Sequence, residues 1–466
     1  ADEHRSFGGQ LLLGGLLGWD ATDARLTESA RWLAEAGIRV ETRIADFAAE
    51  HPNTYRLTLS NPTEQHTMTA VSAGGGMIEV VAIDGVPLSL AGDYFETLLY
   101  LDADGAELLG YLRQHVEADK IALHRGAETQ FIEIKAQPAL DPAIAAVLRS
   151  RFGIERIKQI SPVLPVLSHQ DMRVPFITCE EMLQYNAGLD LELWELALRY
   201  ESARGHLSEE QVFERMAEIV QIMHASILRR IEGTQYADRI LGYQSGGYRA
   251  RMAEGGLLDG GMLNRIILYV TAMMEVKSSM GVIVAAPTAG ACGGLPGACI
   301  GAASEMGLSP DAMTKGMLAA GMIGVFIAAH ATFAAETGGC QAECGAGSGM
   351  AAAALVTLAK GTTGQAVAAA SMALQNILGL ICDPVANRVE VPCLGKNVMA
   401  ASNALACANM ALAGYDPVIP LDEVIETMDR VGKALPRELR CTALGGLSVT
   451  STSREIELRL GTRSTA

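Results

Sequence analysis

Three cysteines of the chain lie beside residues that break regular structure. Cys340 lies within the segment GGCQAE, Cys382 is followed by Asp-Pro, and Cys393 directly follows a proline. Thiolates at such turns suit a metal cluster, because the backbone must bend around the cluster. The chain has no C-x-x-C pair and no compact run of cysteines. Packing as a small buried hydrophobic residue is therefore the alternative interpretation for each thiol.

Two glycine-rich segments have the composition of anion-binding turns. Residues 286–294 (APTAGACGG) follow an apolar stretch and could open a helix, and residues 245–248 (SGGY) form the second segment. Backbone N–H groups exposed at such turns bind carboxylates well. Neither segment is a P-loop or a dinucleotide fingerprint. Tight turns between helices are the alternative for both.

His330 lies ten residues before Cys340, inside the uncharged run of residues 316–335. A buried histidine is either a hydrogen-bonded core residue or, beside a metal site, an acid–base group. A structural zinc site is a further alternative, and it would need a fourth ligand. Cys344 and His330 are the nearest candidates for that ligand.

The N-terminal third of the sequence predicts strands and short helices. Residues 55–60, 66–72 and 77–83 carry β-branched residues, and Asp84-Gly85 is a hairpin signal. Residues 96–163 then predict the order βαββαβ, which is ferredoxin-like and typical of small-molecule-sensing ACT domains. A dimerisation or spacer module is the alternative for this segment.

The remainder of the chain predicts helices after a proline-containing linker at residues 162–178. Residues 208–211 (SEEQ) form a capping-box start for a helix through Arg230, and helical patterns continue to about residue 440. The predicted fold class is α+β. We expect a mixed α/β domain at 1–92, an ACT-like module at 93–165 and an all-α domain with buried Ala/Gly-rich helices at 179–458.

Composition excludes several classes of protein. The 466 residues are 49% hydrophobic and 19% charged, which permits a large core and excludes global disorder. The net charge of −17 and the lack of a basic stripe argue against nucleic-acid binding. Nine cysteines, an odd number, favour a reducing compartment over a disulfide scaffold. No export signal is visible at the start, so we expect a cytoplasmic protein.

The run 316–335 is long enough to span a bilayer. Membrane bundles carry Trp and Tyr at their interfaces, but Trp19, Trp32 and Trp194 all lie outside this half of the chain. We therefore predict a soluble domain with buried central helices and no membrane partner.

Several of these motifs together resemble a known family. APTAGACGG, GGCQAE, GLICDPVA, VEVPC and residues 442–446 (TALGG) are similar to the α domain of iron–sulfur-dependent L-serine dehydratases. The segment HPNTYRLTLS…SAGGGMIEVVAIDG resembles the β domain of the same family, which an ACT-like module follows. The resemblance covers nearly the whole chain, with the motifs in the family's order.

The resemblance implies an oxygen-sensitive lyase that converts L-serine to pyruvate and ammonia. Cys340, Cys382 and Cys393 would ligate a [4Fe-4S] cluster that leaves one iron without a cysteine. That iron would act as a Lewis acid on the substrate while a base removes the Cα proton. The aminoacrylate product would tautomerise and hydrolyse. The implied carboxylate-binding residues are Ser245, Gly246, Gly247, Thr288, Ala289 and Gly290.

The sequence departs from the family pattern at the expected base and near the substrate. An ungapped alignment of LLLGGLLGWD puts Ser6 where the family's β domain has its histidine, with His4 two positions away. His4 and His330 are therefore the candidate acid–base residues. Tyr248, Lys277 and Asn387 replace the Asp, Asn and Gly of the family pattern, and the tail has no terminal cysteine.

These departures keep two alternatives open. One is a lyase of the same fold for L-cysteine, L-threonine or a larger 3-hydroxy amino acid, and the other is an inactive cluster-binding subunit. A pyridoxal-phosphate enzyme ranks low, because Lys277 and Lys396 lack a typical context for that cofactor. The expected partners are a small amino-acid substrate and a second copy of the chain in a homodimer.

Overall fold

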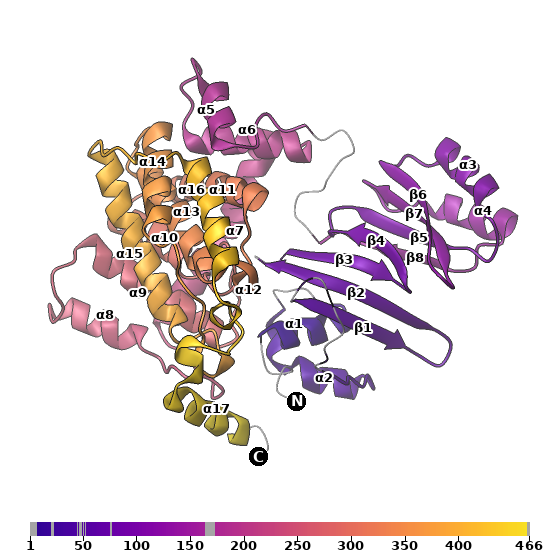
Figure 1. Ribbon diagram of the computed structural model, residues 1–466, viewed down its shortest axis with the longest axis horizontal. Helices are drawn as coiled ribbons and strands as arrows, with labels where there is room; N and C mark the ends of the chain where they lie inside the picture. Colours follow the sequence, from indigo (N-terminus) through magenta and orange to yellow (C-terminus); the bar gives the residue numbers. More distant parts are fainter. Residues whose placement is uncertain are drawn as a thin grey trace. The chain divides into compact units, whose positions relative to one another are not determined.

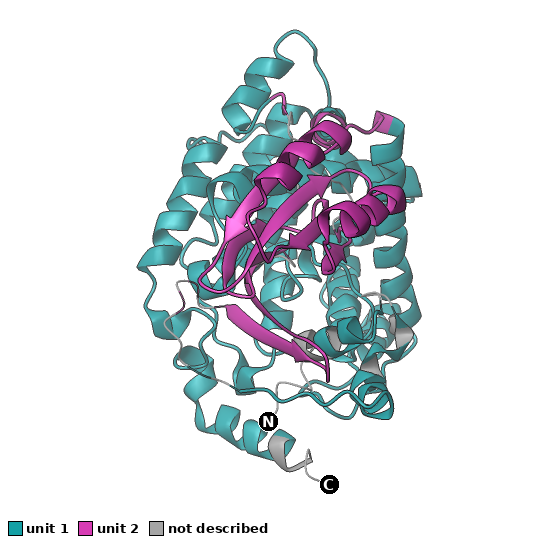
Figure 2. Cartoon of the chain, turned by 90° about the vertical axis from the view of Figure 1, so that its right-hand side faces the viewer, with its two compact units in different colours: residues 1–47, 176–199, 210–466 teal, residues 48–175, 200–209 magenta. Residues whose placement is uncertain are grey.

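The computed structural model describes residues 7–19, 23–43, 45, 49, 51, 53–74, 77–163 and 173–463. They form two compact units (Figure 2). Unit 1 comprises residues 1–47, 176–199 and 210–466, and unit 2 comprises residues 48–175 and 200–209.

Unit 2 begins with a four-stranded antiparallel sheet in the order β1-β2-β3-β4. Its strands are β1 (Thr54–Ser60), β2 (Gln65–Gly74), β3 (Met77–Ile83) and β4 (Val86–Leu90). The three strands predicted here are confirmed. Asp84 and Gly85 form the turn between β3 and β4, where Ile83 pairs with Val86, so the hairpin signal is also confirmed.

The second sheet of unit 2 is antiparallel and has the order β6-β7-β5-β8. Its elements follow one another as β-α-β-β-α-β, the order expected from the sequence. They are β5 (Phe95–Tyr100), α3 (Ala106–His115), β6 (Lys120–Arg125), β7 (Gln130–Ala136), α4 (Pro142–Phe152) and β8 (Ile157–Ile160). The Asp141 side chain caps α4, which ends at Gly153 in the left-handed conformation.

Two apolar clusters hold unit 2 together. The first packs β5 and β7 against α3 and α4 and includes Leu99, Ile132, Leu112 and Leu148. The second joins the two sheets, because it contains Val86 from β4 together with Leu98 from β5 and Phe131 from β7. The sheets therefore share a core.

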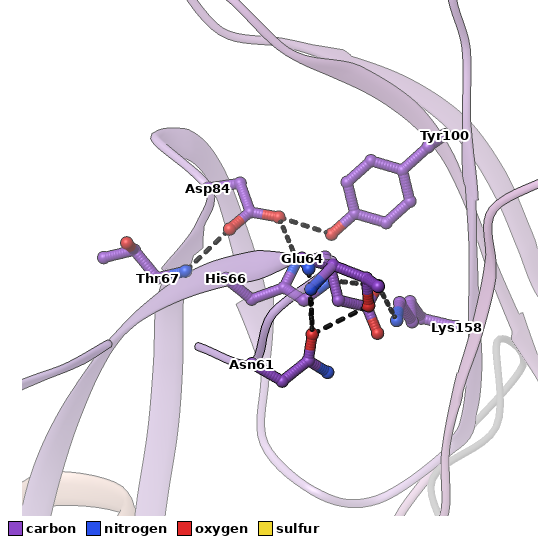
Figure 3. Close-up of polar contacts among 8 residues, drawn as sticks. Asn61, Glu64, His66, Thr67, Asp84, Tyr100 and Lys158 are labelled. Atoms are coloured by element: carbon purple, nitrogen blue, oxygen red, sulfur yellow. Dashed lines mark hydrogen bonds and ion pairs between the residues drawn. The ribbon is translucent and has the colours of Figure 1, made fainter. Parts of the chain in front are cut away.

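A hydrogen-bonded network also joins the two sheets of unit 2. Asp84 Oδ2 accepts the Tyr100 hydroxyl at 2.7 Å and lies 2.8 Å from His66 Nδ1, while Asp84 Oδ1 accepts the Thr67 N–H at 2.7 Å (Figure 3). His66 and Thr67 belong to β2 in the first sheet, and Tyr100 ends β5 in the second. The turn after β3 is therefore fixed against the second sheet.

The described part of unit 1 is helical (Figure 1). Before unit 2 come α1 (Phe7–Leu16), the 3-10 turn η2 (Ala24–Glu28) and α2 (Ser29–Glu35). The later α-helices are α5 (Cys179–Asn186), α6 (Leu193–Gly205), α7 (Glu209–Ile231), α8 (Ser245–Ala253), α9 (Met262–Ser278), α10 (Gly294–Glu305), α11 (Pro310–His330), α12 (Ala335–Gly338), α13 (Ala346–Leu358), α14 (Thr363–Gln375), α15 (Cys393–Leu412), α16 (Leu421–Ala434) and α17 (Ser451–Arg463). The end of α6 and the first residue of α7 fall within residues 200–209, which are assigned to unit 2. Short turns are η3 (Gln341–Gly345), η4 (Val385–Asn387), η5 (Arg437–Leu439) and η6 (Gly446–Val449).

The core of unit 1 is built from Ala/Gly-rich helices. Every residue of α13 except Thr357 is buried. A Cβ at Gly297 in α10 would lie 2.5 Å from a Val270 side-chain atom in α9, so these helices approach more closely than a larger side chain allows. The predicted helix from residue 208 to 230 is found as α7, but the expectation that helical structure stops near 440 is wrong, because α17 follows.

The long apolar helix of the sequence is α11. It is the one described helix that is long and apolar enough to cross a membrane, and 67% of its most apolar window is buried inside the protein. This burial is consistent with a core helix of a soluble protein.

Candidate functional site

The three cysteines singled out by the sequence lie in one buried region of unit 1. Cys340 immediately precedes the π-helical turn η3, Cys382 lies in the loop after α14, and Cys393 begins α15. All three thiols are buried. The pKa of Cys340 responds to Cys344 and Cys382, and that of Cys382 responds to Cys340 and Cys441, so these thiols are close enough to interact. The structure thus adds two thiols, Cys344 and Cys441, to the predicted set.

Hydrogen bonds join the loop of Cys340 to the loop of Cys382. Gln341 donates its N–H to the Leu380 carbonyl at 3.0 Å, and its Oε1 accepts the Gly379 N–H at 2.9 Å. Cys441 donates its N–H to the Cys382 carbonyl at 2.9 Å. Two segments about 40 residues apart in sequence and a third near residue 440 therefore hold their thiols against each other.

Asn397 connects Cys393 to the glycine-rich turn of residues 286–294. The Asn397 side chain is fully buried, and its Nδ2 donates to the carbonyls of Gly290 at 3.0 Å and Cys393 at 2.9 Å. Its Oδ1 accepts the N–H groups of Gly293 at 3.1 Å and Gly294 at 2.8 Å. This one amide fixes the start of α10 relative to the start of α15.

The electrostatics of the thiol region favour one thiolate. Hydrogen bonds from Cys344 and Cys382 hold the pKa of Cys340 well below its usual value, and the Lys396 ammonium contributes. Lys396 donates to the Ile381 carbonyl and to Asp383 Oδ1, both at 2.7 Å. Burial raises the pKa of Cys393 to about 12. One ionised thiol beside a partly buried cation is a typical environment of a metal-binding cysteine.

The donor set fits a cluster in its chemistry. In the described residues, no three His, Cys, Asp or Glu side chains are grouped to hold a single metal ion. The cysteines are all free thiols in this part of the chain. Buried thiols with a lowered pKa at Cys340 are the ligands that iron–sulfur clusters take, and a cluster binds each of them on a different iron.

Glu343 lies beside this region and was missed by the sequence analysis. Thr288 donates its hydroxyl to Glu343 Oε1 at 2.6 Å, and a Cβ at Gly290 would lie 2.7 Å from the same oxygen. Burial, followed by the negative charge of Cys340, raises the pKa of Glu343 to about 8. A carboxyl group with a pKa near neutrality is suited to proton transfer. Its one sequence signal was its charge in a region with few charged residues.

The second glycine-rich segment begins α8, and a carboxylate of the protein itself already binds some of the donors at this helix start. The buried Glu275 carboxylate accepts the N–H groups of Gln244 at 2.5 Å and Ser245 at 3.0 Å, and the Ser245 hydroxyl at 2.5 Å. Gly246 and Gly247 follow in the first turn of the helix. Ser245 is therefore oriented by Glu275.

Of the two predicted acid–base histidines, the structure describes His330. His330 is the last residue of α11, is partly exposed, and its Nε2 hydrogen-bonds with the Ile177 carbonyl at 3.1 Å. The expectation that His330 is buried is wrong, because the helix ends there and the backbone turns at Ala331. His4 lies outside the described residues.

Comparison with known proteins places the helical part of the chain among serine dehydratases. A family model described as "Serine dehydratase alpha chain" matches residues 188–448. The chain is 36% identical over 285 residues to the "Probable L-serine dehydratase, alpha chain" of Bacillus subtilis (strain 168). The aligned residues cover 61% of this chain and 95% of that protein. It is 36% identical over 282 residues to the "L-serine dehydratase, alpha chain" of Peptoniphilus asaccharolyticus, and the aligned residues cover 60% of this chain and 96% of that protein. It is 34% identical over 283 residues to "L-serine dehydratase 1" of Escherichia coli (strain K12), and the aligned residues cover 59% of this chain and 62% of that protein.

Proposed function

Because the chain belongs to the serine dehydratase alpha-chain family, we propose that it is a lyase that eliminates water from L-serine and releases pyruvate and ammonia. The names of its relatives support L-serine as the substrate. The observation that carries the proposal is the buried group of thiols beside the Thr288–Glu343 pair.

Cys340, Cys382 and Cys393 would hold a [4Fe-4S] cluster in this proposal. Such a cluster, when bound by three cysteines, supplies a Lewis-acidic iron for the substrate hydroxyl. The burial of the three thiols and the lowered pKa of Cys340 support the assignment. Cys407 does not belong to the site, because it is buried in α15 and hydrogen-bonds with Asn376 and Asn403.

Glu343 would accept the Cα proton of the substrate at its carboxylate. The Thr288 hydroxyl holds one of its oxygens, and the close approach of Gly290 leaves no space for a side chain there. A carboxylate with a pKa near 8 is a stronger base than an ordinary glutamate. His330 and His4 are retained in the proposal as further acid–base groups.

The substrate carboxylate would lie against backbone amides of Ala289 and Gly290 and of Gly246 and Gly247. The Lys277 ammonium adds a positive charge, and this charge partly offsets the rise in the pKa values of Glu343 and Cys393. Lys277 is held by a hydrogen bond to the Val389 carbonyl. A cation and exposed amides are what a carboxylate requires.

The organisation of the whole protein is part of the proposal. We assign residues 1–92 to a β-type domain, 93–165 to a ferredoxin-like, ACT-like module and 179–458 to the all-α catalytic domain. The antiparallel order β6-β7-β5-β8 supports the second assignment. We also propose a cytoplasmic homodimer.

The decisive experiment is anaerobic purification with iron and sulfide analysis, followed by a pyruvate assay with L-serine. We expect close to four irons per chain and formation of pyruvate. Cys340→Ala, Cys382→Ala and Cys393→Ala should each lose iron and activity together, whereas the matched control Cys407→Ala should lose neither. Equal behaviour of all four variants would refute the ligand assignment.

The substrate is tested in the same assay with L-threonine and L-cysteine. Faster turnover of either compound than of L-serine would favour the alternative lyase, and a loaded cluster without turnover of any of them would favour an inactive subunit.

A further inference from the structure

Among the described residues, Cys441 is the one cysteine that is partly exposed, and the dehydratase proposal gives it no role. The other eight cysteines are buried, and all nine are free thiols. The oxidation of a thiol depends on its access to the oxidant. A solute that oxidises thiols therefore reaches Cys441 before the others.

A short backbone pairing holds Cys441 beside Cys382. Cys382 donates its N–H to the Leu439 carbonyl at 2.9 Å, and its own carbonyl accepts the Cys441 N–H at 2.9 Å. The pairing is a parallel bridge between Cys382 and Arg440. Neighbouring strands lie about 4.7–4.9 Å apart, and disulfides join residues whose Cα atoms are about 4.4–6.8 Å apart. The backbone spacing of such a pairing is therefore compatible with a disulfide.

The Cys441 side chain packs against the buried thiols. Cys441 has a φ angle of 56°, in the left-handed region, so the chain turns at this residue instead of continuing the extended pairing. Its side chain contacts the buried apolar group that contains Cys340, Cys344 and Cys382. In agreement with this proximity, the neighbouring thiols of Cys340 and Cys441 raise the pKa of Cys382. Cys441 and Cys382 are thus two reduced thiols in contact, one open to solvent and one enclosed.

We propose that Cys382 and Cys441 form a reversible disulfide when the chain without cluster meets a peroxide. Hydrogen peroxide oxidises the Cys441 sulfur to a sulfenic acid, and one water is released. The Cys382 sulfur then attacks the Cys441 sulfur, so that the S–S bond forms as the S–O bond breaks and a second water leaves. The two thiols lose two electrons and two protons in total, which convert one peroxide to two waters. A dithiol reverses the reaction by thiol–disulfide exchange.

The disulfide takes up one of the proposed cluster ligands. A sulfur in a disulfide does not bind iron, because the thiolate is the metal ligand. The oxidised chain therefore stays without cluster until a reductant frees Cys382, and meanwhile that sulfur is protected from irreversible oxidation to the sulfinic acid. This consequence rests on the proposed role of Cys382 in the dehydratase, whereas the disulfide itself does not.

The test treats the full chain without cluster with a small excess of hydrogen peroxide. The remaining thiols are blocked with N-ethylmaleimide, and tryptic peptides are mapped by mass spectrometry without reduction. Trypsin releases Cys382 within residues 361–388 and Cys441 within residues 441–454, and neither peptide contains another cysteine. The mass of a linked pair therefore identifies both sulfurs.

We expect the parent to show residues 361–388 linked to residues 441–454, with two fewer alkylated thiols, and dithiothreitol should remove the link. Cys441→Ser should keep all of its remaining thiols at this dose, because they are buried. The matched control Cys407→Ser, which changes a buried thiol in α15, should form the link as the parent does.

Three results would overturn the disulfide proposal. The first is a parent without any disulfide. The second is a parent in which residues 316–360 are linked to residues 361–388, because this joins Cys382 to Cys340 or Cys344 instead. The third is loss of as many thiols from Cys441→Ser as from the parent.

Cluster loading from ferrous iron and sulfide tests the consequence separately. The oxidised parent should take up iron more slowly than the same sample pretreated with dithiothreitol, whereas peroxide-treated Cys441→Ser should load equally fast with and without the pretreatment. If the disulfide forms and the rate of loading does not change, Cys382 is not a cluster ligand, which contradicts the proposed dehydratase site and not the disulfide. A loaded, reduced chain that makes no pyruvate would likewise count against the proposed function alone.

Discussion

Replacing Asn397 by Ala should destabilise the helical unit strongly. The change removes the amide that makes four hydrogen bonds to backbone groups, two as donor and two as acceptor. At a net value of about 1 kcal/mol each, the loss is about 4 kcal/mol. The higher helix propensity of Ala returns roughly 0.6 kcal/mol. The expected net loss in free energy of unfolding is therefore about 3 kcal/mol.

Urea denaturation followed by far-UV circular dichroism measures this loss on the chain without cluster. With a slope of about 1–3 kcal/mol per molar urea, the midpoint should fall by at least about 1 M. Asn409→Ala is the matched control, because it removes the same amide from an exposed position on the same helix. The reasoning is refuted if both variants unfold at the same urea concentration.

Three further predictions concern the site. Burial and the charge of Cys340 raise the pKa of Glu343 from 4.5 to about 8. Between these pH values the folded chain keeps a proton on Glu343 that the unfolded chain has released. The free energy of unfolding should therefore fall as the pH rises from about 4.5 to 8. The urea midpoints at pH 5 and pH 9 should differ less in Glu343→Gln than in the parent. The turnover of the parent should rise with pH around 8, and the turnover of Glu343→Gln should be at least about 100-fold lower than that of the parent. Gly290→Ala should displace Glu343 and lower turnover without loss of iron. Gly321→Ala changes a glycine in an open position of α11, and it should raise the free energy of unfolding by about 0.5–1 kcal/mol. His330→Ala should keep its iron and lose about 100-fold in turnover, and unchanged turnover would leave this histidine with only its contact to Ile177.

Local chemistry made much of the fold predictable. The strands of unit 2 carry β-branched residues, and the Asp84-Gly85 pair tolerates the positive φ angles that the β3–β4 turn adopts. The start of α7 follows a polar capping segment. By contrast, α17 lies beyond residue 440, where the helical pattern was expected to end, and the 3-10 turn η6 separates it from the preceding turns.

The cysteines could be found from sequence because each lies at a turn signal, but the residues that position them could not. Glu343 and Asn397 lie 54 positions apart, and no periodicity relates them. They meet the turn at Thr288–Gly290 only through tertiary packing. The burial expected for His330 failed because an apolar run does not show where its helix emerges at the surface.

The start of α5 depends on a residue that is synthesised much later. Asp422, in the first turn of α16, accepts the N–H groups of Cys179 and Glu180, both at 2.9 Å and more than 240 positions away in sequence. At the usual pace of translation, roughly 10–50 s separate the synthesis of these two helices. Cys340, Cys382 and Cys393 are all made within that interval. On the ribosome, the bundle therefore still lacks this closing contact when its predicted cluster ligands have already been made.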